Sequence, residues 1–465
     1  MSKCSCNECD LEVFENNNRC IFHCEKDNWI TKYDPSSDEF DLGTEVIYFW
    51  DEEKVKKFWK KFKEVIEEQK DLFEKDSYYR FYGFIFPKME QDTFKDYTFD
   101  CDLVFTEKCS FEGDINFFQT IFNRQIYFND CKIKGKVSFG KSIFKDRFTF
   151  NNIKEIKEVF FKHAEFKEKV EFKESWCEKV DFENTTFEKL ADFKNTTFAK
   201  SINFEKTTFR DISVFTNVTF KNDVDFKYTT FEKLAQFKEA IFEKRLNLED
   251  SIIKEKINFL KIKTKNNKEL NSFNMANRET ARIIKDSFEQ QNNIIEANKF
   301  YALEMKEREK ELEEDIKKGK NFFEWLVFKI HGLASNHSQD WILALFWIIS
   351  LTFLTSFIKT IDSNFSQTIE KIGLSFILIS IIFFININIS NSKKLYYLIC
   401  GLVYYLIYAV FTKDFSLTIF SNLINPFSIM TGKEELNFGI LLYKITIAYL
   451  IYQLIISIRQ NTRRK

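Results

Sequence analysis

The first 24 residues hold the densest group of metal-binding side chains in the chain. Its members are Cys4, Cys6, Cys9, Cys20, His23 and Cys24. Thiolates from a C-x2-C knuckle and a C-x3-C knuckle can complete a tetrahedral zinc site, and the ion would stabilise a segment too small to have its own core. We therefore predict a structural zinc ion whose ligands are Cys6, Cys9, Cys20 and Cys24. Cys4 and His23 remain as alternative ligands.

The cellular compartment favours a metal over disulfides. The N-terminal sequence MSKCSCNECDLEVFENNNRC has no apolar stretch of signal-peptide length, so we expect this part of the chain in the cytosol with reduced thiols. Free or redox-active thiols are the alternative interpretation of the cluster. A catalytic zinc is disfavoured, because all-thiolate sites are usually closed and no acid or base accompanies these cysteines in the sequence.

No other sequence pattern indicates catalysis. The chain has no Gly-rich phosphate loop, G-x-S-x-G or H-E-x-x-H motif, and its 4 histidines are scattered. Lys+Arg 69 against Asp+Glu 70 leaves a formal net charge of -1, which gives no general attraction to nucleic acid. We expect a protein that is not an enzyme and does not bind nucleic acid.

Phenylalanine recurs at a fixed spacing through the middle of the chain. There are 57 Phe but only 11 Gly and 3 Pro, so Phe must fill a regular packing role. From Phe117 the large apolar residues alternate at steps of five and six, as in Phe182, Phe187, Phe193 and Phe198. Neither a helix period nor a strand period produces this spacing. The repeating unit is (V/I)-x-F-x-x-(T/S/A)-x-F-x-x-x.

This unit resembles the Phe-centred repeat of the pentapeptide-repeat family over roughly Phe94 to Phe259, and the whole chain resembles the membrane-anchored subtype with C-terminal transmembrane helices. Segments such as FKNTTFAKSINFEKTTF carry the resemblance. It implies an all-β right-handed quadrilateral β-helix, in which each central residue and the residue two before it point inward. The run would supply about seven coils, each rising by about 4.8 Å. The Lys/Glu-rich outward positions then form a solvated, charge-paired surface, with a recognition surface of definite charge pattern as the alternative.

Helices are expected at both ends of the solenoid, because uncovered end coils would pair with other molecules. Before the repeats, one helical stripe contains Val55, Trp59, Phe62, Ile66 and Phe73. After the repeats, a two-helix segment has the inner stripe Ala281, Ile284 and Phe288. This second segment is predicted to be both a cap and a connector to the membrane part.

The chain is predicted to have five parts. They are a zinc knuckle at 1–30, a helical N-terminal cap at 31–92, the solenoid at 93–262, a helical cap, connector and interfacial helix at 263–330, and a transmembrane domain at 331–465. Four stretches are long and apolar enough to span a bilayer, namely 341–358, 372–389, 395–411 and 438–458. An amphipathic segment just before them, with Trp325 and Lys329, is predicted to lie in the membrane interface.

Four spans and a cytosolic solenoid return the C-terminus to the cytosol. The basic tail from Arg459 to Lys465 then lies inside, as the positive-inside rule prefers. We predict a multi-pass protein of the inner (cytoplasmic) membrane with both termini in the cytosol. Lys444 and Gln453 are polar residues at or near membrane depth, and Lys444 is expected to snorkel to the interface.

The segment between the third and fourth spans is long enough to re-enter the membrane. Some pentapeptide-repeat membrane proteins end in a unit that is similar to a potassium-channel pore, and the pore candidates here are Asn425, Thr431 and Gly432. A T-x-G-Y-G filter is missing from the sequence, so potassium selectivity is unsupported. The leading prediction is a scaffold that contacts the lipid bilayer and binds an unknown cytosolic protein. The alternative is an ion channel or sensor, and the sequence leaves open a homo-oligomer.

Overall fold

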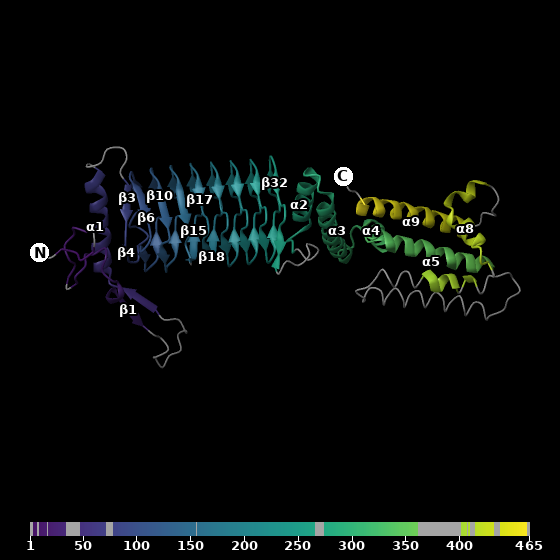
Figure 1. Ribbon diagram of the computed structural model, residues 1–465, viewed down its shortest axis with the longest axis horizontal. Coiled ribbons are helices and arrows are strands. Elements are labelled where there is room, and N and C mark those ends of the chain that lie inside the picture. Colours follow the sequence, from purple (N-terminus) through teal and green to yellow (C-terminus); the bar gives the residue numbers. More distant parts are fainter. Residues whose placement is uncertain are drawn as a thin grey trace. The chain divides into compact units, whose positions relative to one another are not determined.

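The computed structural model describes residues 3–6, 9–15, 17–33, 47–70, 78–154, 156–265, 274–360, 401–406, 408–409, 414–431 and 438–462. These residues belong to two units, Met1–Asn293 and Ile294–Lys465. The described part of the first unit contains a stack of short strands with helices at its ends, and that of the second is helical (Figure 1). Each unit is described separately below.

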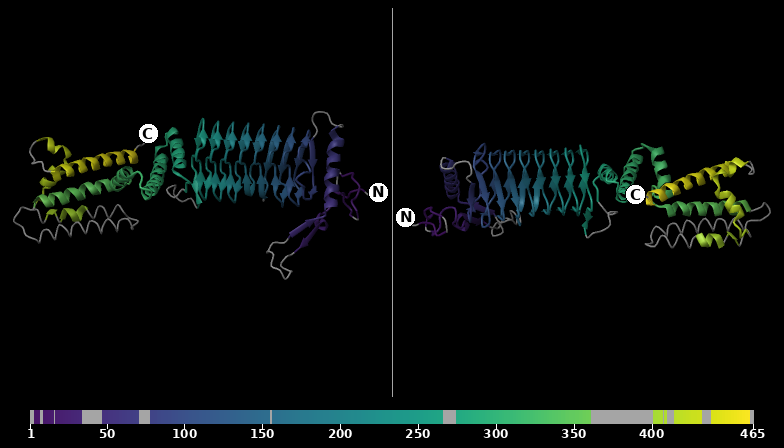
Figure 2. Two further views of the ribbon diagram at one scale, coloured as in Figure 1. Left: turned by 180° about the vertical axis from the view of Figure 1, so that it is seen from behind. Right: turned by 45° about the horizontal axis from the view of Figure 1, so that its top comes forward.

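Short parallel strands in the first unit form a four-sided β-solenoid of about eight coils (Figures 1 and 2). The first face contains β3 (Tyr78–Phe81), β6 (Asp102–Phe105), β10 (Ile126–Asn129), β14 (Phe148–Asn151), β17 (Val170–Glu171), β20 (Ala191–Asp192), β24 (Ser213–Val214), β28 (Ala235–Gln236) and β32 (Ile257–Asn258). The fourth face contains β5 (Thr98–Phe99), β9 (Ile121–Phe122), β13 (Ile143–Phe144), β16 (Glu165–Phe166), β19 (Thr186–Phe187), β23 (Thr208–Phe209), β27 (Thr230–Phe231) and β31 (Ile252–Ile253).

The second and third faces lie between these two. The second contains β4 (Ile85–Phe86), β7 (Ser110–Phe111) and β11 (Lys132–Ile133), then β21 (Thr197–Phe198), β25 (Thr219–Phe220), β29 (Ile241–Phe242) and β33 (Lys263–Thr264). The third contains β8 (Ile115–Asn116), β12 (Val137–Ser138), β22 (Ile202–Asn203), β26 (Val224–Asp225) and β30 (Leu246–Asn247). Two longer strands, β15 (Ile156–Phe160) and β18 (Trp176–Asp181), join these faces. The predicted β-solenoid fold is confirmed.

Phenylalanine rings fill the interior in the register that the repeat predicts. Phe182, Phe204 and Phe226 lie above one another in successive coils, with ring centroids 5.1 and 4.7 Å apart and nearly parallel planes. Phe198 and Phe220 stack in the same way at 5.6 Å, and all five rings are buried. Since each ring removes a large apolar area from water, these columns supply the core that holds the coils together.

One coil is a residue shorter than the others around it. Partners on neighbouring coils are mostly 22 residues apart, as are Thr186 and Thr208, but Ile156 pairs with Cys177, 21 residues on. Cys177 takes the place of a Phe centre and is fully buried. In this coil β18 runs through the corner as one continuous strand, which is why the second and third faces merge into one sheet.

A ladder of buried hydroxyl groups connects successive coils. The Oγ1 atoms of Thr185, Thr196, Thr207 and Thr229 each donate a hydrogen bond to a Phe carbonyl of the preceding coil, at 2.6–2.8 Å. The residue before each threonine has a positive φ, such as 56° at Asn184. Several of these corner positions carry Asn or Asp, which tolerate the left-handed region, so the corners form with few glycines.

Helix α1 (Glu52–Lys70) covers the N-terminal end of the solenoid (Figure 2). Trp59 packs edge-on against Phe94, with centroids 5.8 Å apart, and its Nε1 donates to the carbonyl of Lys88 at 2.8 Å. The predicted stripe is buried at Val55, Trp59, Phe62 and Ile66. The predicted N-terminal cap helix is therefore present, although Phe73 lies outside the described residues.

The segment predicted as a purely helical cap also contains strands. After η1 (Asp27–Trp29), β1 (Ile30–Tyr33) pairs with β2 (Ile47–Trp50) in an antiparallel hairpin. Further on, β3 and β4 already pair with solenoid strands β6 and β7. The solenoid thus begins at Tyr78, ahead of the predicted boundary at 93, because β3 and β4 belong to an irregular first coil that precedes the regular Phe series.

Helix α2 (Arg278–Gln290) covers the other end of the solenoid. Its N-cap residue Asn277 accepts a hydrogen bond from the backbone N–H of Thr280 at 2.9 Å. The Thr280 hydroxyl in turn accepts the backbone N–H of Leu248, and the Ser287 hydroxyl donates to the carbonyl of Ile257. The predicted inner stripe, Ala281, Ile284 and Phe288, is buried. These bonds satisfy backbone groups of the last coil that would otherwise be open to edge pairing.

The second unit contains α3 (Ile294–Lys317), α4 (Phe322–Ser335), α5 (Trp341–Thr360), α8 (Thr418–Ile424), η5 (Pro426–Thr431) and α9 (Phe438–Thr462). Phe438–Gln460 is the described helix that is long and apolar enough to cross a membrane, and Trp341–Ser356 is a shorter apolar helix. The predicted spans 438–458 and 341–358 fall on these two helices. The predicted span 372–389 lies outside the described residues, as does most of 395–411, so the multi-pass arrangement stays a prediction.

Candidate metal centre

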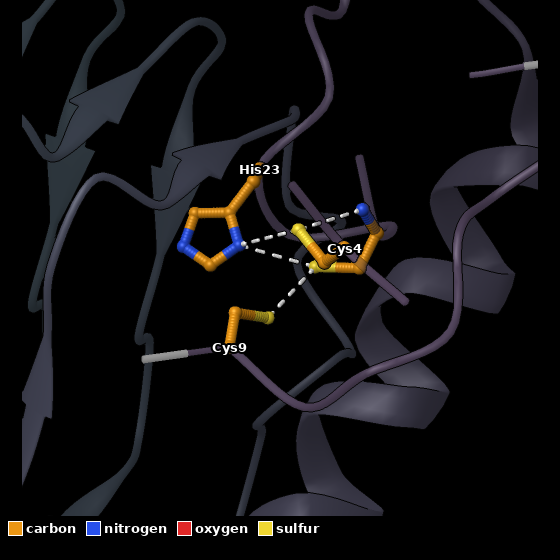
Figure 3. Close-up of side chains that lie close together, drawn as sticks. Cys4, Cys9 and His23 are labelled. Carbon is orange, nitrogen blue, oxygen red and sulfur yellow. Dashed lines mark hydrogen bonds between the residues drawn. The ribbon is translucent and has the colours of Figure 1, made fainter. Parts of the chain in front are cut away.

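Four side chains of the N-terminal head converge on one point. They are Cys4, Cys9, Cys20 and His23, whose ligand atoms all lie within 4.8 Å of one another. The Nδ1 atom of His23 is 3.1 Å from Cys20 Sγ and 3.7 Å from Cys4 Sγ, and Cys9 Sγ is 3.6 Å from Cys20 Sγ (Figure 3). Three sulfur atoms and one imidazole nitrogen are a donor set for a tetrahedral metal ion.

Backbone hydrogen bonds bring the two knuckles together. The N–H of Cys4 donates to the carbonyl of Leu11 at 2.9 Å, and the N–H of Cys20 donates to Cys4 Sγ at 3.3 Å. The second knuckle is a tight turn in which the N–H groups of His23 and Cys24 both donate to the carbonyl of Cys20. The cluster therefore depends on local turns in two short segments.

The first coil of the solenoid orients the histidine. His23 Nε2 lies 3.1 Å from the carbonyl oxygen of Tyr82, and its ring meets Phe84 edge-on at 5.0 Å. A hydrogen bond from Nε2–H to this carbonyl leaves Nδ1 as the lone-pair nitrogen that faces the thiols. Next to it, Phe22 stacks on Phe84 at 4.8 Å, and its carbonyl accepts the N–H of Ile85 at 2.8 Å.

Burial favours the uncharged form of most groups in the cluster. Burial raises the pKa of the Cys20 and Cys9 thiols, and burial lowers the pKa of His23, so the imidazole is neutral and can act as a ligand. For Cys4 burial opposes ionisation, but N–H donors from Cys20 and Cys6 lower the pKa of its thiol overall. A metal ion would bind the sulfur atoms as thiolates and displace the protons of the thiols, which makes binding pH-dependent.

The structure gathers a different set of four from the one we predicted. Cys9 and Cys20 belong to it, but Cys4 and His23, named above as alternatives, occupy the positions predicted for Cys6 and Cys24. Cys6 lies outside the convergent group and is half-buried. Cys24 points the other way, with its Sγ 3.4 Å from the buried ammonium of Lys26 and 3.6 Å from the carbonyl of Ile21.

The pore candidates do not form a comparable group among the described residues. Asn425 follows α8, and its carbonyl accepts a hydrogen bond from the Lys444 ammonium at 2.8 Å. Thr431 ends η5, and Gly432 lies outside the described residues. Lys444 itself is buried within the protein, and its snorkelling to a membrane interface stays a prediction. Its ammonium is held by the polar backbone at the end of α8.

A second buried polar cluster was not predicted from the sequence. The Oε1 atom of Gln453 accepts hydrogen bonds from the hydroxyls of Ser335 and Ser338 at 3.0 and 2.9 Å. His331 Nε2 lies 3.3 Å from the Ser338 hydroxyl, and its Nδ1 lies 3.1 Å from His337 Nδ1. Only the polarity of Gln453 within an apolar span signalled this cluster, because its other members come from the last part of α4 and the turn that follows it.

The stacking of short parallel strands on four sides places the protein in the class of β-solenoids. Comparison with protein families shows that residues 204–252 match the family model for pentapeptide repeats, in 9 copies. The chain therefore contains a pentapeptide-repeat β-solenoid, as the sequence predicted. No curated protein and no solved structure matches the chain.

Proposed function

We propose that this protein is a membrane-anchored scaffold of the inner membrane. In this proposal α5, α9 and two further spans at 372–389 and 395–411 hold the chain in the bilayer, with both termini in the cytosol. The pentapeptide-repeat solenoid then presents a rigid surface to a cytosolic protein. Neither catalysis nor ion conduction is part of the proposed role.

The polarity of α9 carries the membrane part of the proposal. Its outward side chains, each 55–60% exposed, include Leu442, Ile445, Tyr452 and Ile455. Its inward side chains include the polar residues Lys444, Gln453 and Ser457, all nearly inaccessible. In water this arrangement is unfavourable for two reasons. Apolar surface stays exposed to water, and the buried polar groups are desolvated. In hydrocarbon both placements are favourable.

Helix α4 supports the same environment. One side carries Phe323, Val327 and Leu333, which are exposed. Two residues elsewhere on α4 form ion pairs with α3. Glu324 pairs with Arg308, and Lys329 pairs with Glu313 at 2.8 Å. A helix with one charged and one apolar side fits the headgroup region, as we predicted for this segment.

A pair of lysine substitutions tests the membrane location. Ile445→Lys places a charge on the outward side of α9, whereas Ile295→Lys places one on an equally exposed position of α3. If α9 lies in lipid, the first change makes the free energy of membrane insertion less favourable by about 2–3 kcal/mol. Less of this variant should then stay in the membrane fraction after carbonate extraction. The second leaves the fraction unchanged. Equal membrane retention of both variants contradicts the proposed anchor.

The outer surface of the solenoid supports the scaffold role. Ion pairs join neighbouring coils, such as Lys200 with Glu178 at 2.8 Å and Lys233 with Glu255 at 2.7 Å. Exposed pairs of this kind contribute little to stability, so the Phe columns supply the rigidity. The charges are instead fixed in rows on a rigid frame, which suits recognition of a partner with a complementary pattern.

Photo-crosslinking in cells tests that role. A photoreactive side chain can replace an outward residue on each face, at Val214, Thr219, Asn203 and Thr208 for the first to fourth faces. A scaffold predicts that one face crosslinks a defined cytosolic protein far more than the other three do. The same faint set of abundant proteins from all four faces contradicts the scaffold.

We further propose that the cluster in the head binds zinc. Three thiolates and an imidazole suit zinc by softness and geometry, and a site with four protein ligands is closed, which indicates a structural ion. Because His23 contacts the turn before β4, the ion would fix the head against the first coil. Loss of the ion is then expected to loosen the N-terminal cap.

A further inference from the structure

The end of helix α8 surrounds a buried positive charge. Lys444, on α9, is 1% exposed. Its Nζ donates to the carbonyl oxygens of Asn422, Leu423 and Asn425 at 3.1, 2.9 and 2.8 Å, and to the Ser428 hydroxyl at 2.7 Å. All four acceptors belong to a stretch of seven residues, so the chain wraps its oxygen atoms around one point.

Backbone geometry explains why these oxygens converge. The last carbonyls of a helix have no partner within the helix, and they form the negative end of its dipole. Here the chain turns sharply after Ile424, where Asn425 adopts an extended conformation and its side chain accepts the N–H of Phe427 at 3.0 Å. This turn starts η5 and brings the Ser428 hydroxyl back towards the end of α8.

The chemistry of this cradle favours a monovalent cation of about the size of ammonium. Its oxygens are neutral dipoles, which favour a compact charge but offset less of the dehydration cost of a divalent ion. The donor distances are those of good ammonium hydrogen bonds. A guanidinium is planar and presents its donors in a fork, so an arginine would not fit four oxygens around one nitrogen.

We propose that Asn422, Leu423, Asn425 and Ser428 form a monovalent-cation site, and that the Lys444 ammonium occupies it as a tethered ligand that fixes α8 and η5 to α9. The proposal does not depend on the scaffold role or on the metal in the head. It gives Asn425 the role of a cation ligand through its backbone. It also implies that a free ammonium ion can take the site once the lysine side chain is removed.

Chemical rescue tests this site. The detergent-solubilised full-length protein and its Lys444→Met variant are melted in ammonium, potassium, sodium and choline chloride at one ionic strength. We expect the wild-type Tm to be the same in all four salts. The variant should melt lower in choline, and ammonium should raise its Tm with a saturable concentration dependence, because a ligand of the folded state stabilises it by mass action. Potassium should have a smaller effect, and sodium the least.

Two further variants keep the test decisive. Lys310→Met removes an exposed lysine of α3 and should respond to the salts as the wild type does. Ser428→Ala keeps the lysine but removes one oxygen, so it should lower the Tm by less than Lys444→Met. A Lys444→Met protein that folds only in ammonium supports the proposal. The proposal is overturned if Lys444→Met melts like the wild type in choline, or if its Tm follows the same salt order as that of Lys310→Met. It is also overturned if Lys444→Met fails to fold in every salt while Ser428→Ala melts like the wild type.

Discussion

His23 Nε2 and the carbonyl oxygen of Tyr82 are 3.1 Å apart, although 59 residues separate them in the sequence. This contact joins the cysteine-rich head to the first coil of the solenoid. It also fixes which nitrogen of His23 faces the thiols. Beside it, Phe22 inserts between the cap helix and the coil, with its ring on Phe84 and edge-on to Phe58. The head therefore acts as part of the N-terminal cap, and the proposed metal site and the cap should gain or lose stability together.

Protein purified under reducing conditions should carry about one zinc ion per chain. Cys9→Ser and His23→Gln should lose the metal and lower the Tm, because each removes a ligand of the convergent cluster. Cys6→Ser should keep the metal, since its thiol lies outside that cluster. Elemental analysis together with a melting curve measures both effects. A Cys6→Ser protein without zinc, alongside a His23→Gln protein that retains it, would restore the set predicted from the sequence.

Phe198→Asp should prevent folding of the solenoid. The substitution removes a buried ring that stacks on Phe220 and places a carboxylate in the core, at a cost of more than about 4 kcal/mol. Lys200→Asp, two residues on, should change stability by less than about 1 kcal/mol, because its partner Glu178 is an exposed surface contact. Denaturant unfolding followed by circular dichroism compares them. Similar losses in the two proteins would show that the register is misassigned.

Thr207→Val should destabilise the solenoid by about 1–2 kcal/mol, because the change keeps the shape but removes the hydroxyl that donates to the carbonyl of Phe182 at 2.7 Å. Thr208→Val is the matched control. Its side chain points outward and valine keeps the β-branched shape, so stability should change by less than about 0.5 kcal/mol. The same denaturation experiment measures both. A larger loss at Thr208 than at Thr207 would rule out the hydroxyl ladder as a stabilising element.

The second unit should lose stability in mild acid. Burial, with a smaller contribution from nearby His331, lowers the pKa of His337 to about 4. An unfolded imidazole has a pKa near 6.5, so between about pH 6.5 and 4 the unfolded state binds more protons and stability falls as the pH falls, by up to about 3 kcal/mol. Other groups facing this ring are Glu309 and Lys329.

Substitution by asparagine isolates this contribution. His337 has a φ of 54° and His163 one of 60°, and asparagine tolerates that region, so the two replacements are matched in backbone conformation. The Tm of His337→Asn in detergent should fall less steeply between pH 6.5 and 4 than that of the wild type. His163→Asn, on the solenoid surface, should keep the wild-type slope. Identical slopes for all three proteins would contradict a titrating His337.

Most of the solenoid could be predicted from the sequence because its core is repetitive. Each Phe position can be recognised from the residues next to it in the sequence, so the local pattern predicts which side chains pack in the core. Cys177 is the exception, since the sequence alone does not show that a corner is one residue short and that β18 continues through it. The first coil, which contains β3 and β4, was missed for a related reason, as its residues do not follow the regular spacing.

The four convergent residues of the head could be predicted only as members of a pool of six. Knuckle spacing identifies candidate thiols, but it does not show which way each side chain points. That choice depends on Tyr82 and on the Lys26 ammonium that holds Cys24, and neither belongs to the motif. Lys444 shows the same limit. The sequence places it near a span end but does not show that the open carbonyls at the end of α8 hold its ammonium.

Site-directed labelling of the full-length protein in cells tests the central claim, a membrane anchor with a cytosolic solenoid, most directly. Single reporter thiols are placed at Thr208 on the solenoid, at Thr462 after α9, and at Ser363 between the first two proposed spans, with peptide mass spectrometry separating them from the native cysteines. A membrane-impermeant maleimide should label Ser363 in intact cells, and Thr208 and Thr462 only after permeabilisation, because the basic tail favours the cytosolic side. Labelling of Thr462 or Thr208 in intact cells would contradict the account. So would a result in which neither position is protected from the reagent in any cell fraction.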